Sequence, residues 1–287
     1  MTPAPSAHPG AAPGRASVVH HPHHRPRRGF LYSPIGVWSV RAVTFVVLIG
    51  AWELYASGVS RALFAPPSAI LESIMELAAV GGPLWGALAV SLGALLVGFG
   101  LAIVVGVAIG LLMGRFRPLE YVLDPYVSFL YALPSIALIP LLVIWFGIDA
   151  QLRLALVFLA GVFPVIINTM AGVKNVDPEL LDVGRVAQAS ERQMMWTIVL
   201  PASLPFIFAG VRVALSQALV GVIVAEMTAI ITGLGGMIIR FANFFQTAHL
   251  FVPILAIMVV SVALTELMKR LERRLTPWDR NRIEEAA

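Results

Sequence analysis

Six long apolar runs restrict the fold of this sequence more than any other feature. A helix needs about 20 apolar residues to cross a hydrocarbon core about 30 Å thick, and lipid offers no partner for an unpaired backbone group. Each run is therefore predicted to be a transmembrane helix, which makes the chain an all-α polytopic membrane protein. The runs cover residues 37–55, 84–113, 122–146, 152–173, 205–231 and 250–268. Only 13% of the 287 residues are charged, about half the share in a soluble domain.

Positive charge is distributed unevenly between the two sides of these spans. With six spans both termini lie on one side of the membrane, and that side collects 15 Lys and Arg residues. The opposite side holds three, Arg61, Arg153 and Arg240. Because loops rich in Lys and Arg stay in the cytoplasm, both termini are predicted to be cytoplasmic in a bacterial inner membrane.

The ends of the chain differ from its apolar middle. Residues 1–34 are predicted to be a disordered basic cytoplasmic arm, residues 35–268 a six-helix transmembrane domain, and residues 269–287 a charged cytoplasmic tail. Five of the six histidines lie in the arm. A metal site there is the alternative to a solvated tail, but Pro22 and a mobile chain argue against fixed ligand geometry. The absence of cysteine excludes disulfides and thiolate metal sites.

The loop at residues 174–204 predicts two short helices. Asp177 is a good N-cap and Pro178 suits the first helical position, so a helix is expected over residues 178–188. Ser190 followed by Gln193 forms a capping box for the second helix. One face of the first helix is predicted to carry Leu180, Leu181, Gly184 and Ala187.

This helix pair has three interpretations. A short helix with an apolar face, held between two spans, projects a rigid knob on which a soluble partner can act. The same pattern is typical of an amphipathic helix lying on the membrane surface, and the residues alone leave both interpretations open. A DNA-binding helix-turn-helix is disfavoured, because both ends are tethered to spans and the first helix is not basic.

The loop resembles the signature of binding-protein-dependent ABC importer permeases. That signature is Glu-Ala-Ala, three residues, Gly, nine residues and Ile-x-Leu-Pro. Here Asp182-Val183-Gly184 stands for Glu-Ala-Ala, Gln188 for the glycine, and Ile198-Val199-Leu200-Pro201 for the end. In that family the loop forms the coupling helix, which docks in a cleft of the ATPase subunit. The resemblance implies a docking set of Glu179, Leu180, Leu181, Asp182, Val183, Gly184, Arg185, Ala187, Gln188 and Ser190, with Ile198, Leu200 and Pro201 closing the loop.

The resemblance extends over residues 65–275 and points to the nitrate, sulfonate, taurine and bicarbonate branch. It is carried by Leu123-Asp124-Pro125, Leu133-Pro134, Trp145-Phe146-Gly147, Val224-Ala225-Glu226-Met227 and Gly233-Leu234-Gly235, among others. It implies a type I importer permease that works as a homodimer with two ATPase subunits and a solute-binding protein. The implied cargo is a small anion. ATP and Mg²⁺ would bind the ATPase, with no cofactor or nucleic acid on this chain.

The absence of several motifs limits the reactions that this chain is expected to catalyse. The sequence contains no Gly-x-x-x-x-Gly-Lys-[Ser/Thr], no His-Glu-x-x-His and no Gly-x-Ser-x-Gly, so neither a phosphate-binding loop nor a hydrolase site is predicted. The chain is therefore expected to be a non-catalytic transport subunit. The alternative is a stand-alone secondary transporter driven by an ion gradient, which would show an inverted repeat with broken helices. A membrane enzyme or anchor is a third, weaker interpretation.

Polar residues inside the spans are candidates for the transport path or its gate, because they are costly in lipid. Each can instead form a hydrogen bond between helices. The candidates are Ser128, Tyr131, Ser135, Asn168, Ser216, Gln217 and Glu226. Glu226 lies about 20 residues into the fifth span, so it is expected near the outer face, at the gate or bound to Thr228, Thr232 or a neighbouring helix.

Two further patterns concern helix packing. Arg212 and Asp124 both lie near cytoplasmic ends of spans and are predicted to pair. Gly106, Gly110 and Gly114 repeat every four residues, with Gly98 two turns earlier. Such a stripe favours close packing of helices, either within the chain or at a dimer seam.

Overall fold

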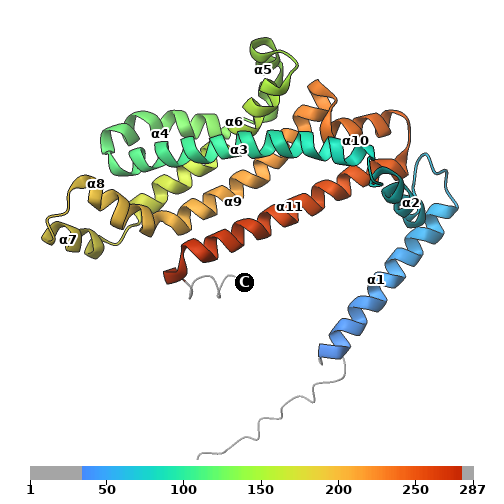
Figure 1. Cartoon of the computed structure of the whole chain (residues 1–287), viewed down its shortest axis with the longest axis horizontal. Coiled ribbons are helices and arrows are strands. Elements are labelled where there is room, and N and C mark those ends of the chain that lie inside the picture. The colour runs from blue at the N-terminus through green and yellow to red at the C-terminus, as the bar shows by residue number, and fades with distance from the viewer. Residues whose placement is uncertain (1–33, 280–287) are drawn as a thin grey trace, which may run out of the picture. The chain divides into compact units, whose positions relative to one another are not determined.

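The computed structural model describes residues 34–279, which form helices and short connections without any strand in that range (Figure 1). The arm predicted for residues 1–33 and the last part of the tail, from residue 280, lie outside the described residues. In chain order the elements are α1 (Pro34–Ser57), α2 (Pro67–Leu77), α3 (Pro83–Arg115), α4 (Arg117–Ala132), η2 (Ser135–Leu138), α5 (Ile139–Phe146), α6 (Ala150–Lys174), α7 (Pro178–Val186), α8 (Glu191–Met194), η3 (Met195–Val199), α9 (Leu200–Ala225), η4 (Glu226–Ile230), α10 (Gly233–Asn243), α11 (Thr247–Leu275) and η5 (Pro277–Asp279).

The chain divides into two compact units, one ending at Gly50 and one starting at Ala51. The boundary falls inside α1, whose residues Gly36–Ser57 are long and apolar enough to cross a membrane. All the packing described below lies within the second unit.

Five of the six predicted spans are confirmed as continuous helices. They cover Gly36–Ser57, Pro83–Arg115, Ala150–Lys174, Glu191–Ala229 and Thr247–Leu275. The predicted span at residues 122–146 is not one continuous helix. It consists of two segments, Arg117–Ala132 and Ser135–Phe146, bent by 89°. The chain leaves the helix at Leu133, whose ψ is 126°, because proline disfavours helical backbone in the residue before it.

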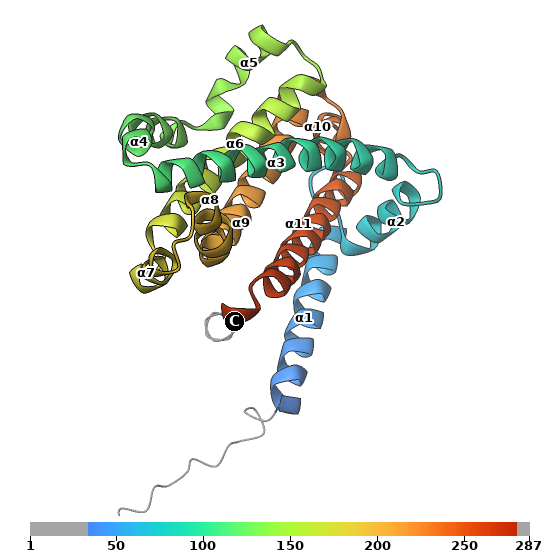
Figure 2. The ribbon, with the colours of Figure 1, turned by 60° about the vertical axis from the view of Figure 1, so that its left-hand side comes forward.

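Helix α6 packs between α3 and α9 in the middle of the second unit (Figure 2). The glycine stripe of α3 makes one of these contacts. A Cβ on Gly98 would lie 2.8 Å from the Cβ of Val157, and one on Gly106 would lie 2.8 Å from that of Val165. The difference in residue number between each glycine and its partner on α6 stays the same as far as Gly114, so the two helices run parallel. The stripe is therefore filled by α6 of the same chain, and a dimer seam along it is excluded.

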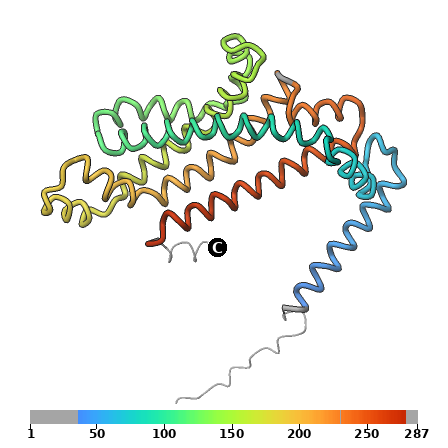
Figure 3. Tube along the Cα trace, in the orientation of Figure 1, coloured from blue at the N-terminus to red at the C-terminus, as the bar shows by residue number. Residues whose placement is uncertain are grey.

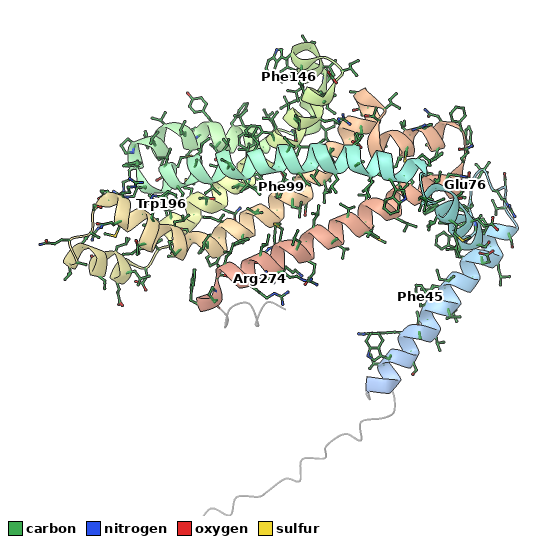
Figure 4. The ribbon with its side chains drawn as sticks, in the orientation of Figure 1. Phe45, Glu76, Phe99, Phe146, Trp196 and Arg274 are labelled. Atoms are coloured by element: carbon green, nitrogen blue, oxygen red, sulfur yellow. The ribbon has the colours of Figure 1, made fainter. Side chains whose placement is uncertain are left out.

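Apolar side chains between α3, α6 and α9 form the main core. Phe99 of α3, labelled in Figure 4, packs with Val157 of α6 and Leu215 of α9. At another contact of α6, Gly210 of α9 lies against Asn168. Glycines of α3 and α9 thus let three long helices approach closely, which replaces the hydrophobic driving force that lipid cannot supply.

The elements at the end of the unit opposite α7 are shorter. Helix α2 is one of them, and Glu53 accepts hydrogen bonds from the backbone N–H of its Ser68 at 3.0 Å and from the Ser68 hydroxyl at 2.7 Å. The glycine-rich helix α10 lies between η4 and α11 in the chain (Figure 1). Helix α11 extends the predicted sixth span by several residues at its C-terminal end.

Candidate functional site

The coupling elbow, defined here as residues 177–199, begins as the sequence predicts. The Asp177 side chain accepts a hydrogen bond from the Glu179 backbone N–H at 2.9 Å, and Pro178 is the first residue of α7. Helix α7 ends at Val186, two residues earlier than expected. Ser190 then starts α8, and the predicted capping box with Gln193 is present in both directions.

A left-handed residue makes the turn between the two helices. Gln188 has φ +53°. Its N–H donates to the carbonyl of Arg185 at 2.9 Å, and the N–H of Ala189 donates to the carbonyl of Gly184 at 3.0 Å. These two bonds are the Schellman pattern that closes a helix C-terminus, in which glycine usually occupies the left-handed position. Gln188, which stands for the glycine of the resembling signature, thus occupies the left-handed position of this turn.

The inside of the coupling elbow is tightly packed around Gly184, which is buried. A Cβ at this position would lie 2.6 Å from the Met194 sulfur and 2.8 Å from Cδ1 of Ile198. Leu181 packs in the same cluster, above Val173 at the end of α6. Packing therefore fixes the angle between the two limbs of the coupling elbow.

The prediction of a single apolar face on α7 is wrong, because its four residues point in two directions. Leu181 and Gly184 point inward, whereas Leu180 is 48% exposed and Ala187 is exposed as well. Val183 and Val186 join the exposed set at 65% and 86%. The outer face of α7, defined as Leu180, Val183, Val186 and Ala187, is an apolar surface that stays exposed among residues 34–279. Val186 was not among the predicted docking residues, although it follows Val183 at the helical spacing of three.

The coupling elbow continues without a break into a long helix (Figure 3), and Trp196 near its start is 63% exposed (Figure 4). The turn at Met195–Val199 is π-helical. Pro201 follows it and lacks the N–H that a regular helix would use there, so the wider turn precedes a residue that cannot continue the usual bonding. Ile198 and Leu200 of the predicted end motif are half-buried.

A cavity of about 340 Å³ lies between the broken third span, α6 and α9. Its polar groups are Ser135, Ser216 and Gln217, set among apolar side chains. None of its lining residues within the described part of the chain is charged. The apolar lining consists of Pro134, Ile136, Ile139, Leu156, Val220, Gly221 and Val224.

The structure brings only some of the predicted path residues together. Ser135 and Gln217 line the cavity. Ser128 and Tyr131 lie exposed on α4, outside that lining. Asn168 donates a hydrogen bond to the Pro164 carbonyl at 2.8 Å within its own helix.

Glu226 is fully buried at the far end of α9 rather than open to a path. Its carboxylate accepts hydrogen bonds from the Ser91 hydroxyl at 2.7 and 2.8 Å and from the Gly235 N–H at 3.0 Å. Nη1 of Arg153 lies 3.6 Å away. These four residues, named the carboxylate clasp, tie α3, α6, η4 and α10 together.

The clasp depends on the glycines at the start of α10. Gly233 has φ +67°, a backbone conformation that glycine adopts at little cost. A Cβ on Gly235 would lie 2.7 Å from the Cβ of Glu226. The expected partners Thr228 and Thr232 do not bond the carboxylate. Thr232 instead accepts a hydrogen bond from Arg153 at 3.1 Å, and no sequence signal linked Ser91 or Arg153 to Glu226.

The predicted pair of Arg212 with Asp124 is also wrong. Arg212 forms an ion pair with Glu272 of α11, and Glu272 is buried. This contact joins the cytoplasm-predicted end of α9 to α11. Asp124 and Glu272 both lie near predicted cytoplasmic ends of helices, so their positions in the sequence did not show which of them pairs with Arg212.

Comparison with known proteins identifies the family. The family model described as binding-protein-dependent transport system inner membrane component matches residues 102–277. The chain belongs to this family. The matched segment includes the coupling elbow, the cavity-lining residues and the clasp residues of α6, η4 and α10.

Individual relatives of this inner membrane component agree with that assignment. The chain is 35% identical over 243 residues to an aliphatic sulfonates transport permease protein, SsuC, of Bacillus subtilis, covering 84% of this chain and 88% of the relative. It is 32% identical over 241 residues to the taurine transport system permease protein TauC of Escherichia coli, covering 82% and 88%.

The fold is shared with a solved transporter. A chain of the inward-facing MetNI methionine ABC transporter superposes with a TM-score of 0.60 at 16% identity, covering 68% of this chain and 96% of that chain. The predicted fold class, an all-helical importer permease, is therefore confirmed. The alternative of a secondary transporter finds no support in these relatives.

Proposed function

We propose that two copies of this permease form the path of an ATP-driven importer and that the outer face of α7 docks on its ATPase subunits. The coupling elbow is the observation that carries the proposal. It places an exposed apolar surface at the tip of a packed, doubly capped turn. Such a turn transmits a push without deforming, because both limbs are held by side-chain packing around Gly184.

Helix length supports the placement of the elbow beyond the lipid. The continuous helix Glu191–Ala229 has 39 residues, which corresponds to about 58 Å. The hydrocarbon core is about 30 Å thick. One end of this helix therefore extends well beyond the hydrocarbon core. Near the other end, the carboxylate clasp holds the Glu226 side chain buried inside the protein.

The energy source lies on another chain in this proposal. The sequence has no phosphate-binding loop of the Gly-x-x-x-x-Gly-Lys type. ATP and Mg²⁺ would bind the ATPase, whose closure would move the two coupling elbows and rock the helices between inward- and outward-facing states. The uneven distribution of Lys and Arg supports a cytoplasmic position for the coupling elbow and both termini.

The uncharged cavity beside α9 is the proposed segment of the path in each copy. Ser135 and Gln217 offer dipoles but no fixed charge. A solute that meets only hydroxyl and amide groups is bound weakly and released easily, so selection would fall to a solute-binding protein. The names of the two relatives support a small anion, such as a sulfonate, as the cargo.

The test is to place a charge on the docking surface without disturbing the fold. Val186→Glu should weaken assembly with the ATPase about tenfold or more, because docking would bury an unpaired charge. The matched control is Val80→Glu, since Val80 is fully exposed in the turn after α2. Affinity is measured between the purified permease and its ATPase, and uptake is measured in vesicles loaded with ATP.

Two outcomes would contradict the proposal. Equal ATPase affinity for the Val186→Glu and Val80→Glu variants would exclude α7 as the docking surface. Uptake that continues without ATP and stops with an uncoupler would favour an ion-gradient transporter instead.

A further inference from the structure

We propose that a second cavity, at the elbow end of the bundle, binds the headgroup of an anionic phospholipid. This cavity has a volume of about 580 Å³, within the range of small-ligand sites. It lies where α3 ends, α4 begins and α6 ends. It is lined by Gly114, Arg117, Glu120, Tyr121 and Lys174. None of these residues belongs to the transport cavity or to the outer face of α7.

The charges of this lipid cavity leave one cation available. Lys174 forms an ion pair with Glu120 across it. Arg117 is exposed, and within residues 34–279 its side chain has neither an ion pair nor a hydrogen bond. A guanidinium binds phosphate through two parallel hydrogen bonds, which makes it well suited to a phosphodiester. The net charge of the lining is therefore complementary to a single anionic headgroup.

Neighbouring charges do not change this balance. Arg115, which ends α3, forms an ion pair with Glu191 at the start of α8. The next carboxylate along α4 is Asp124, one turn beyond Glu120 and outside the lining. The cavity thus combines an arginine that has no side-chain partner among residues 34–279 with a lysine whose carboxylate partner a phosphate can replace.

The surface leading away from the cavity favours a lipid over a free phosphate ion. Tyr121 is 87% exposed at its edge, and aromatic side chains of this kind gather at the headgroup level of membranes. Val122, Tyr126 and Phe129 follow on one face of α4 and are 59%, 65% and 64% exposed. Their spacing of four and three residues makes a continuous apolar strip along which acyl chains can lie.

The position of the lipid cavity connects it with the coupling elbow. Lys174 is the last residue of α6, three residues before the Asp177 cap of α7. Arg115 reaches α8 from the other side. A headgroup bound here would hold the ends of α3, α4 and α6 together at the base of the elbow. The inference concerns binding and does not require ATP coupling.

The experiment measures lipid binding by the detergent-purified full-length permease with native mass spectrometry. Dioleoyl-phosphatidylglycerol is titrated against dioleoyl-phosphatidylcholine, with inorganic phosphate as a third probe. Wild type should retain phosphatidylglycerol preferentially, and Arg117→Gln should reduce that retention about tenfold, because a charge-assisted hydrogen-bond pair is lost. Lys174→Gln should reduce it at least as much, since this substitution removes a cation and leaves the Glu120 carboxylate unpaired beside the phosphate.

The matched control is Arg240→Gln, which removes an exposed arginine from α10 at the opposite end of the unit. It should leave phosphatidylglycerol retention unchanged. Equal retention by wild type and Arg117→Gln would overturn the proposal, as would displacement of the lipid by millimolar inorganic phosphate. Loss of ATPase assembly in Arg117→Gln with unchanged lipid retention would assign the cavity to a protein partner and overturn it too. None of these three results affects the test of the outer face of α7.

Discussion

Arg153 of α6 and Glu226 of η4 meet with their charged groups 3.6 Å apart, and the side chain of Glu226 is completely buried. The separation exceeds hydrogen-bond length, so the arginine compensates the charge while Ser91 and Gly235 donate hydrogen bonds to the carboxylate oxygens. Nε of Arg153 is buried without a partner among the described residues. The clasp is thus held by charge balance as much as by hydrogen bonds.

The first prediction concerns this charge balance. Arg153→Met should destabilise the permease by about 3 kcal/mol, because it leaves a buried carboxylate without a cation. The double variant Arg153→Met, Glu226→Gln should recover much of that loss, since glutamine can still bond Ser91 and Gly235. Unfolding is followed in detergent by heating or by denaturant. Additive losses in the double variant would show that the two charges do not interact.

The second prediction concerns the left-handed turn of the coupling elbow. Gln188→Gly should stabilise the protein by up to about 1 kcal/mol. A left-handed backbone costs a non-glycine residue about 1 kcal/mol or more, and glycine removes this strain. Part of the gain is lost, because glycine gives the unfolded chain more conformational entropy. Gln188→Val should destabilise it, since a branched Cβ fits this region poorly. Thermal unfolding and protease cleavage near residue 188 give the readout. Equal stability of the two variants would contradict the turn geometry.

The third prediction concerns the glycine stripe between α3 and α6. Gly106→Ala should cost about 1–3 kcal/mol, because its Cβ would overlap Val165 and lie 3.0 Å from the Val162 carbonyl. The further change Val165→Ala should relieve part of the loss. Gly100→Ala is the matched control, since nothing lies within 4 Å of its Cβ. A control variant as damaging as Gly106→Ala would mean that close packing is not the cause.

Local patterns predicted the elements well, because their physical causes lie within a few residues. The Ser190–Gln193 capping box, the Asp177 cap and the glycine repeat all act over one or two helical turns. Long-range partners were not predictable in the same way. Ser91 is 135 residues from Glu226, and nothing in either segment specifies the other.

The break in the third span shows a second limit of sequence reasoning. Pro134 interrupts the helix, whereas Pro125 and Pro164 lie inside continuous helices. A proline removes the same hydrogen bond in each case. Whether the helix bends or breaks depends on which neighbouring groups donate hydrogen bonds to the freed backbone carbonyls. Tertiary packing decides which groups are close enough. The cavity lies at this break and is lined by Pro134 and Ser135.

The fourth prediction tests that cavity as the path of an anion. Gln217→Glu should lower uptake of an anionic substrate about tenfold or more, because two like charges 4 Å apart repel by about 4 kcal/mol at an effective dielectric constant of 20. Ser128→Glu is the matched control, since Ser128 lies exposed on α4 outside the cavity. Uptake is measured in vesicles with the ATPase and binding protein present, and ATPase assembly is checked in both variants.

If both variants transport equally well, the anion does not pass Gln217. If both fail equally, any added carboxylate is harmful and the cavity has no special part in transport. A loss confined to Gln217→Glu, with assembly intact, requires the substrate to come within a few ångströms of this side chain.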